Sequence, residues 1–310
     1  MVKVSIVMAV YNDESNIESS IDSILNQTYQ DWELIIVNDG CTDKTPLLLD
    51  KVAQKDDRIK ILEQKNMGLT HALIRGCQEA KGEYIARQDS GDISFPTRLT
   101  QQVKVLDQDI NVSLVSSFTK FVAPQKEILQ IAEVASLRFR KTNDPFAIDN
   151  FQMPTHHGNT MFRHRDYQKV GGYRDNFYYA QDRDLWIRLI EIGDHLIIPE
   201  ILYQAQFYAN SISGQHSQEQ RQLKQLIDLI TIERRKGNNQ LELLKKASLI
   251  RKKPESKITK NNRLAEGYYF LGSCLMAKND SHARYYLFKA IRLNPFYLKA
   301  YAKIIMALLQ

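Results

Sequence analysis

The first hundred residues of the chain repeat one pattern, in which a short apolar run is followed by a polar turn and an amphipathic segment. The apolar runs occupy residues 2–10, 32–37, 59–62 and 84–87, and the segments between them have helical spacing. Strands that alternate with helices are joined by right-handed crossovers, so the pattern predicts a mostly parallel sheet. We therefore expect an α/β fold of Rossmann-like type, with helices flanking the sheet.

Polar and acidic side chains stand where three of these runs end. Asp39 follows the second run, Asp89 follows the fourth, and Tyr11 and Asn12 follow the first. The carboxyl ends of parallel strands meet at one edge of a sheet, which is where open α/β folds bind their ligands. Each acid alone is equally well explained as an ordinary turn residue. Their convergence on one edge favours a binding site.

Asp89 and Asp92 lie three positions apart, with Gly91 between them. Carboxylate oxygens suit Mg²⁺ or Mn²⁺, ions that commonly bridge to phosphates, and glycine lets the turn adopt a positive φ. Neither the G-x-G-x-x-G fingerprint after the first run nor a P-loop occurs in the sequence. We therefore expect phosphate charge to be met by a metal held on carboxylates.

Further along the chain, His156 and His157 are adjacent, and Asp182 stands at the start of an amphipathic segment. Neighbouring side chains on a strand point to opposite faces, so we expect only one of the two histidines, His157, to line the cleft. Asp182 is either a helix-start acid favoured by the helix dipole or a general base at the cleft floor.

Residues 2–210 as a whole resemble the family 2 glycosyltransferases, which have the GT-A fold. The resemblance lies in blocks that occur in the family's order and spacing: residues 4–12, 37–43, 66–69 and 82–89, with Pro96 and Arg98 after them, then 171–173 and 181–186. Each block is loose by itself, whereas the ordered series is specific.

The resemblance implies an inverting transfer of a sugar from a nucleoside-diphosphate sugar, with a UDP-sugar favoured, to a saccharide or lipid-linked acceptor in polysaccharide synthesis. It implies Asp182 as the catalytic base and Asp89 as the first acid of the metal-binding DxD motif, with Mg²⁺ or Mn²⁺ as cofactor. The residues matched to the nucleotide-sugar are Ala9, Tyr11, Asn12, Asp39, Asn66 and Asp89, and those expected at the acceptor side of the cleft are His157, Arg163, Gln181 and Trp186.

Two positions depart from the family pattern. Gly91 occupies the place of the second DxD acid, and Gln181 stands where the family often has glutamate. Either Asp92 supplies the missing metal ligand, or metal affinity is weak, or activity is lost. We favour Asp92 as the ligand. The rival interpretation is a non-catalytic binding or scaffold protein with a degraded metal site.

Residues 216–310 form the expected second part of the chain, after a GT-A domain at residues 1–215. Their pattern predicts a helical appendage, with a hairpin near residues 265–310 that resembles a tetratricopeptide repeat. A single repeat cannot bury its own apolar face, so we expect it to pack on the catalytic domain, on a protein partner or on a second copy.

Composition and charge indicate the compartment and the kinds of partner that we expect for the protein. The three cysteines are isolated from one another and no apolar run reaches the roughly 18 residues of a membrane span, so we expect a cytoplasmic protein. A basic stretch at residues 234–263 could lie on anionic lipid or nucleic acid, or form a solvated helical face. We favour the last and predict no nucleic-acid partner, leaving contact with a membrane surface open.

Overall fold

The computed structural model describes residues 2–139, 152–211, 217–251 and 256–309, which form two compact units. Unit 1 contains residues 1–119, 132–205 and 223–250, and unit 2 contains residues 120–131, 206–222 and 251–310. The division into residues 1–215 and 216–310 stays a prediction, and the packing groups residues 223–250 with unit 1.

The first part of unit 1 follows the predicted alternation of strands and helices. Its elements are β1 (Val4–Val10), α1 (Ile17–Leu25), β2 (Trp32–Asn38), α2 (Thr45–Ala53), β3 (Ile59–Glu63), α3 (Leu69–Gln78) and β4 (Tyr84–Asp89). They are followed by β5 (Ile93–Ser94), α4 (Arg98–Gln108), β6 (Val112–Val122), β7 (Ile128–Ala132) and β8 (Arg138–Phe139). The remaining elements before the helical region are η1 (His157–Asn159), β9 (Met161–Arg163), α5 (His164–Lys169), α6 (Gln181–Ile190) and β10 (Asp194–Gln206).

The sheet of unit 1 has the strand order β3-β2-β1-β4-β9-β6-β10-β5, with β8 paired to β10. β3, β2, β1 and β4 run parallel to one another, whereas β9 is antiparallel to both β4 and β6. This arrangement confirms the predicted α/β fold with a mostly parallel N-terminal sheet. In the register, Ala9 of β1 lies opposite both Val37 of β2 and Asp89 of β4, so the three strands end together.

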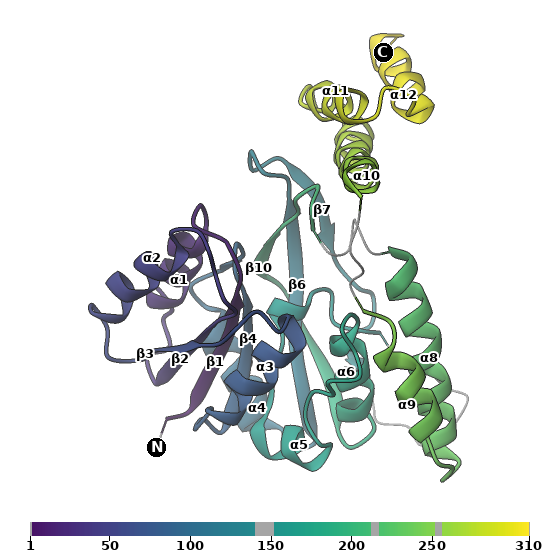
Figure 1. The fold of residues 1–310 in the computed structure, drawn as a ribbon. Helices are drawn as coiled ribbons and strands as arrows, with labels where there is room; N and C mark the ends of the chain where they lie inside the picture. The colour runs from purple at the N-terminus through teal and green to yellow at the C-terminus, as the bar shows by residue number, and fades with distance from the viewer. Residues whose placement is uncertain (1, 140–151, 212–216, 252–255, 310) are drawn as a thin grey trace. The chain divides into compact units, whose positions relative to one another are not determined.

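Helices cover both faces of this sheet because alternate side chains of each strand point to opposite sides (Figure 1). Ile6 and Met8 of β1 pack in a core with side chains from α1, α2 and α4. Val7, between them, packs in a second core with side chains from α3, α5 and α6. The strands are therefore buried on both faces, which leaves their ends as the place where polar groups can reach a ligand.

Two features of unit 1 were not predicted. The long strand β10 follows α6 and pairs antiparallel with β5 and β8. α8 (Ser217–Arg235) and α9 (Leu241–Ser248) lie in a region that was predicted only as helical, without bounds for its elements. Ile227 and Ile230 of α8 and Ala247 of α9 pack in one core with Ile187 of α6. The two helices that follow β10, α8 and α9, are thereby packed against α6, the helix that precedes it.

The helices of unit 2 confirm the predicted helical tail. α10 (Lys257–Met276), α11 (Ala283–Leu293) and α12 (Leu298–Leu309) succeed one another, and β7 pairs with β6. Leu271 and Leu275 of α10 pack with Tyr286 of α11 in the core of this unit. The Tyr286 hydroxyl donates a 3.1 Å hydrogen bond to the carboxylate of Glu127, in the turn before β7.

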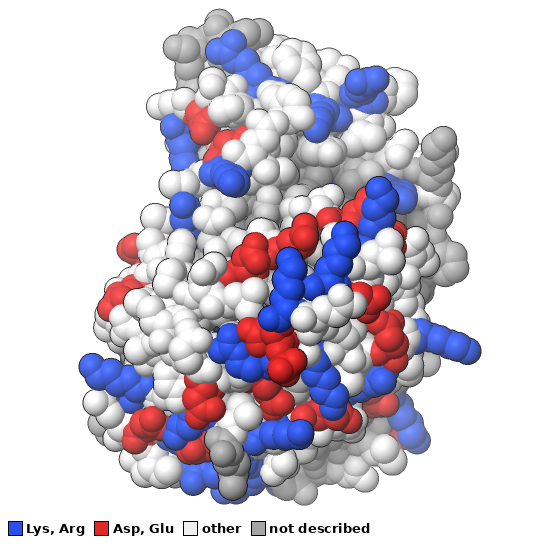
Figure 2. Space-filling view, turned by 90° about the vertical axis from the view of Figure 1, so that its left-hand side faces the viewer, with Lys and Arg blue, Asp and Glu red and all other residues white. Residues whose placement is uncertain are grey.

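Much of the predicted basic stretch is neutralised by acidic partners. Arg234 and Arg235 both bind the carboxylate of Glu191, at 2.8 and 2.7 Å, and Arg263 pairs with Glu219 at 3.1 Å. On the face drawn in Figure 2, acidic and basic side chains are interspersed over much of the surface. Among the helices that the structure describes, none combines the length and the apolar character needed to cross a bilayer.

Gly82, at the turn into β4, offers a test of how closely the strands pack. A Cβ at this position would lie 2.5 Å from the Ser5 backbone nitrogen and 2.9 Å from the Tyr84 carbonyl oxygen. We expect Gly82→Ala to lower the free energy of unfolding by about 1–3 kcal/mol, measured by urea denaturation, because neither backbone group can move aside. The neighbouring exposed Lys81→Ala is the control and should change it by less than about 0.5 kcal/mol. Equal effects of the two substitutions would contradict the packing described.

Candidate functional site

The carboxyl edge of β1, β2 and β4 gathers the residues predicted to bind a nucleotide-sugar. Ala9 and Asp89 are neighbours across the β1–β4 pair, and Asp39 follows β2 directly, with its backbone N–H donating to the Val10 carbonyl at 2.9 Å. Tyr11 is half exposed, with 51% of its surface accessible, although its ring is large and apolar. An aromatic ring displayed at such an edge can stack on a planar ligand group.

Asp39 fixes the loop that follows β3. Its carboxylate accepts hydrogen bonds from the Gln64 side chain at 2.7 Å and from the backbone N–H groups of Met67 and Gly68, both at 2.8 Å. Gly40, at φ +74°, comes so close to the backbone of Asn66 that a Cβ would lie 2.7 Å from its nitrogen. Asp39 and Asn66 are therefore held at the same edge of the sheet, and their part in binding a nucleotide-sugar stays a prediction.

Asn12 joins the first two strand ends. It adopts a left-handed conformation with φ of 51°, its side-chain oxygen accepts from the Thr42 N–H at 2.7 Å, and its own N–H donates to the Cys41 sulfur at 3.1 Å. Asparagine tolerates this backbone region better than most residues. The loops after β1 and β2 are thus tied to each other rather than independent.

The turn after β4 is shaped by Gly91, whose φ of 90° confirms the expected positive value. The Gly91 N–H donates to the Ser20 hydroxyl at 2.9 Å, and that hydroxyl donates to the carbonyl of Asp92, also at 2.9 Å. Ser20 belongs to α1, so this helix anchors the turn at both Gly91 and Asp92. This anchoring leaves Asp92 buried, at 5% exposure, beneath the strand end.

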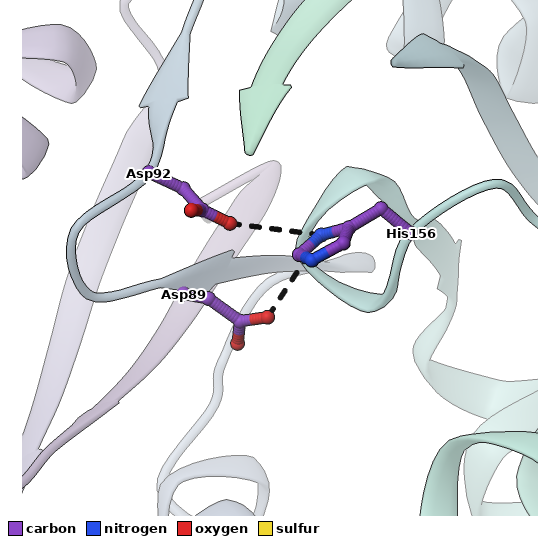
Figure 3. A group of neighbouring side chains, drawn as sticks. All are labelled: Asp89, Asp92 and His156. Carbon is purple, nitrogen blue, oxygen red and sulfur yellow. Dashed lines mark ion pairs between the residues drawn. The ribbon is translucent and has the colours of Figure 1, made fainter. Parts of the chain in front are cut away.

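Asp89, Asp92 and His156 point toward one another (Figure 3). One ligand atom from each lies within 4.8 Å of the other two, and the His156 Nδ1 is 3.6 Å from Asp92 Oδ2 and 4.0 Å from Asp89 Oδ2. Two carboxylates and one imidazole form a donor set suited to a divalent cation, with the carboxylates favouring Mg²⁺ or Mn²⁺. The residues present therefore fit the metal that the sequence led us to expect.

His156 was not selected from the sequence, which favoured His157 as the histidine that lines the cleft, whereas the structure turns His156 toward the acids. His156 precedes the short helix η1 and accepts the Gly158 N–H at its Nδ1, which turns its ring toward the carboxylates. His157 is buried below, where its Nε2 lies 2.7 Å from the Tyr173 hydroxyl and 3.4 Å from the Arg87 Nε. The choice between them depended on a one-turn helix that periodicity does not reveal.

Charges buried beneath the cluster set its protonation. Although burial disfavours its charged form, the nearby Arg87 holds the pKa of the Asp89 carboxyl below its usual value, and Arg87 Nη2 donates to Asp89 Oδ1 at 2.6 Å. Burial lowers the pKa of His157 to about 3, and burial also lowers that of His156. At neutral pH the site thus presents an ionised Asp89 beside neutral imidazoles.

Asp182 stands in the first turn of α6, after Ala180 in a left-handed conformation. Its carboxylate accepts the Arg183 N–H at 2.8 Å. Burial raises the pKa of the Asp182 carboxyl, and the negative charge of Asp89 adds to that rise. Gln181 beside it is 5% exposed.

Trp186, one turn further along α6, packs edge-on against the ring of His157 with centroids 6.0 Å apart. Its buried indole N–H has no hydrogen-bond partner among the residues that the structure describes. The structure thus joins α6 to the histidine segment, and the role of Trp186 and His157 at an acceptor stays a prediction.

Arg163 is the one predicted cleft residue that the structure does not bring to this edge. On the antiparallel strand β9 it lies opposite Tyr84, the first residue of β4, whereas Asp89 is the last. Its guanidinium donates to the carbonyls of Val112 and Asp109, at 2.8 and 2.9 Å. Arg163 therefore binds the turn between α4 and β6, at the end of the sheet away from Asp89.

Tyr203 of β10 contacts all three members of the cluster. Its hydroxyl donates to Asp92 Oδ2 at 2.9 Å and accepts the backbone N–H of Asp89 at 3.1 Å. Its ring stacks on that of His156, with centroids 5.5 Å apart. Nothing in the sequence pattern singled out this residue, because its strand was not predicted.

Comparisons with known proteins point to one family. Residues 5–171 match the family described as Glycosyl transferase family 2. EpsE of Bacillus subtilis, named as a glycosyltransferase, is 36% identical over 199 residues, which are 62% of this chain and 68% of that protein. The O-antigen biosynthesis glycosyltransferase WbnJ of Escherichia coli is 32% identical over 188 residues, covering 60% of this chain and 71% of its own length.

Two solved structures share the fold at low sequence identity. S. aureus TarS 1-349 in complex with UDP-GlcNAc has a TM-score of 0.59 and 15% identity, over 94% of this chain and 89% of that one. A mannosyltransferase from Pyrobaculum calidifontis in complex with GDP-Man and Mn²⁺ has a TM-score of 0.54 and 17% identity, over 99% and 87% of the respective chains.

Because Tyr203 holds Asp92 toward the cluster, we expect Tyr203→Phe to weaken Mn²⁺ binding about tenfold, as removal of an outer hydrogen-bond partner of a metal ligand typically does. The affinity is measured by calorimetric titration of Mn²⁺ into the full chain.

Tyr173→Phe is the matched control, since it removes a buried hydroxyl that contacts His157 but no carboxylate of the cluster. Its Mn²⁺ affinity should stay within about twofold of the unmodified protein, on the same scale of outer-partner effects. Equal Mn²⁺ affinities of the two variants would show that Tyr203 does not position the cluster.

Proposed function

Because this chain belongs to glycosyl transferase family 2, we propose that it transfers a sugar from a nucleoside-diphosphate sugar to a hydroxyl of a saccharide or lipid-linked acceptor, with inversion at the anomeric carbon. The chain is a glycosyltransferase, and relatives such as WbnJ are named for O-antigen biosynthesis. We place its reaction in the synthesis of cell-surface polysaccharide. Donor, acceptor and stereochemistry are the parts that experiment must test.

The nucleotide would bind across the ends of β1 and β2. A carboxylate has about four sites that accept hydrogen bonds, and three on Asp39 are already taken by the loop at residues 64–68. The remaining site is free to accept an N–H from a base. Tyr11 and Asn12 would flank the base and ribose from the neighbouring loop.

The diphosphate would bind at the Asp89, Asp92 and His156 cluster. These residues would hold Mg²⁺ or Mn²⁺, which when bound acts as a Lewis acid for the charge that grows on the leaving diphosphate. Asp92 thereby takes the part that the usual second DxD acid plays, and Gly91 permits the turn that buries it. The arrangement supports an active enzyme over the scaffold interpretation.

Asp182 would accept the proton of the attacking hydroxyl. A single displacement needs one base on the side away from the leaving group and no carboxylate nucleophile. The Arg183 N–H fixes one oxygen of Asp182, and its raised pKa brings the carboxylate nearer to the basicity that proton transfer requires. Gln181, next to it, would contact the acceptor.

The observation that carries the proposal is the convergence of Asp89, Asp92 and His156 at one strand edge. Solved structures with the same fold have been obtained with UDP-GlcNAc and with GDP-Man, so the fold itself does not choose the nucleotide. We favour a UDP-sugar.

The first test is calorimetric titration of UDP, GDP and dTDP into the protein, each with and without Mn²⁺. We expect UDP to bind in a Mn²⁺-dependent manner, with affinity lowered at least tenfold in Asp92→Ala because a metal ligand is lost. Binding of GDP alone would correct the donor assignment. No binding by any nucleotide would contradict the proposal.

Removal of the base should abolish transfer without affecting donor binding. We expect Asp182→Asn to lower sugar transfer about 10²- to 10⁴-fold, the usual contribution of a general base. Transfer is followed as label passing from the nucleotide-sugar to acceptor extracted from membranes. The control is Asp175→Asn, which changes an exposed carboxylate shortly before α6 and should leave the rate unchanged. Full transfer by Asp182→Asn would contradict its role.

The raised pKa of Asp182 predicts how the rate of sugar transfer depends on pH. The base must be ionised, so the rate should be lost as pH falls through the Asp182 pKa, which burial places above the ordinary value for aspartate. We expect the acid limb of the kcat/KM profile above about pH 3.9, the unperturbed value. An acid limb at that unperturbed value would show that Asp182 is not the group observed.

A further inference from the structure

The last thirty residues of unit 2 carry positive but no negative side chains. From Ser281 to Gln310 the sequence has five basic residues and no Asp or Glu. The basic residues are Arg284, Lys289, Arg292, Lys299 and Lys303. The ion pairs of the described residues involve none of these five side chains, in contrast to Arg234, Arg235 and Arg263. Apart from Lys289, whose ammonium lies over the rings of Tyr268 and Tyr285, these side chains therefore carry positive charge that no ion pair of the described residues offsets.

α12 presents apolar side chains to solvent on one continuous arc. At 100° per residue, Leu298, Tyr301, Ile305 and Met306 fall on adjoining positions of the helix, and all are exposed. Leu298 is 77% exposed and Ile305 58%. Phe296, two residues before the helix, is 88% exposed. The opposite side of α12 is already used, because Ala300 packs with Ala265 and Ala290 in the core of unit 2.

Lys299 and Lys303 lie at one border of this arc, one helical turn apart. An apolar arc bordered by lysines is typical of helices that lie in the interface of a membrane, where the apolar side enters the acyl boundary and the ammonium groups reach the lipid headgroups. α11 adds to the positive charge through Arg284 and Arg292, which share its exposed side with Phe288.

We propose that α12, together with Phe296, binds the surface of an anionic lipid bilayer. A second copy of the chain fits less well, since pairing two such surfaces would bring Lys299 and Lys303 of each near the same positive charges of the other. An anionic bilayer meets both the charge and the exposed apolar area. The proposal does not depend on the transferase reaction, although a lipid-linked acceptor would be found at the same surface.

The test is sedimentation of the full chain with vesicles of phosphatidylcholine alone or with added phosphatidylglycerol. We expect binding only to the anionic vesicles. Binding should weaken strongly between about 0.1 M and 1 M salt, as the Debye length falls from about 10 Å to about 3 Å. Equal binding to both vesicle types, or to neither, would overturn the proposal.

Matched variants separate this helix from general adhesion. Leu298→Ser should weaken vesicle binding about tenfold, because it removes a leucine side chain from the apolar arc. Leu249→Ser changes an equally exposed leucine in unit 1, at 79% exposure, and should leave binding unchanged. Lys299→Glu together with Lys303→Glu should abolish the preference for anionic lipid.

Two further measurements distinguish loss of membrane binding from misfolding and from self-association. Circular dichroism should be the same for all variants, since the substituted side chains are exposed or lie at the helix border. Light scattering should show a monomer whose mass Leu298→Ser does not change. A dimer that Leu298→Ser dissociates, without vesicle binding, would assign the arc to a second copy and overturn the proposal.

Discussion

Two buried guanidinium groups beneath the end of β4 are the constraint on which the site depends. Arg98 donates to the Arg87 carbonyl at 2.6 Å and to the Ser94 hydroxyl at 2.6 Å, and both arginines are fully buried. A buried charge is tolerated only when it is paired and hydrogen-bonded. Asp89 and Asp92 supply the opposite charges, so the acids at the strand end stabilise the fold beneath them as well as facing the cleft. Removal of either acid leaves a buried cation undercompensated.

The parts of the fold that were predicted correctly are those that depend on local pattern. β1, β2, β3 and β4 begin and end within two residues of the apolar runs predicted at residues 2–10, 32–37, 59–62 and 84–87, because the apolar residues of each run are nearly continuous. β10 was missed because Pro199 and Glu200 interrupt its apolar residues, and proline argues against a strand interior. With β10 missed, Tyr203 had no predicted position from which to reach the cluster.

The residues of the candidate site likewise divide into those that the sequence could place and those that it could not. Residues at the carboxyl ends of parallel strands, such as Asp39 and Asp89, could be placed from the sequence because parallel strands fix which ends meet. Arg163 could not, since the antiparallel direction of β9 sends it to the far end of β4. His156 and His157 are indistinguishable in sequence, and only the turn into η1 decides which ring faces the acids.

The charge balance at the end of β4 also bears on the order in which ligands arrive. Arg87 and Arg98 partly offset the charges of Asp89 and Asp92, so a divalent ion entering alone should bind more weakly than an ion that enters with a diphosphate. An ion that enters together with a diphosphate brings its own neutralising charge. Thermodynamic linkage then makes ion and nucleotide favour each other's binding by equal factors, without any movement of the protein.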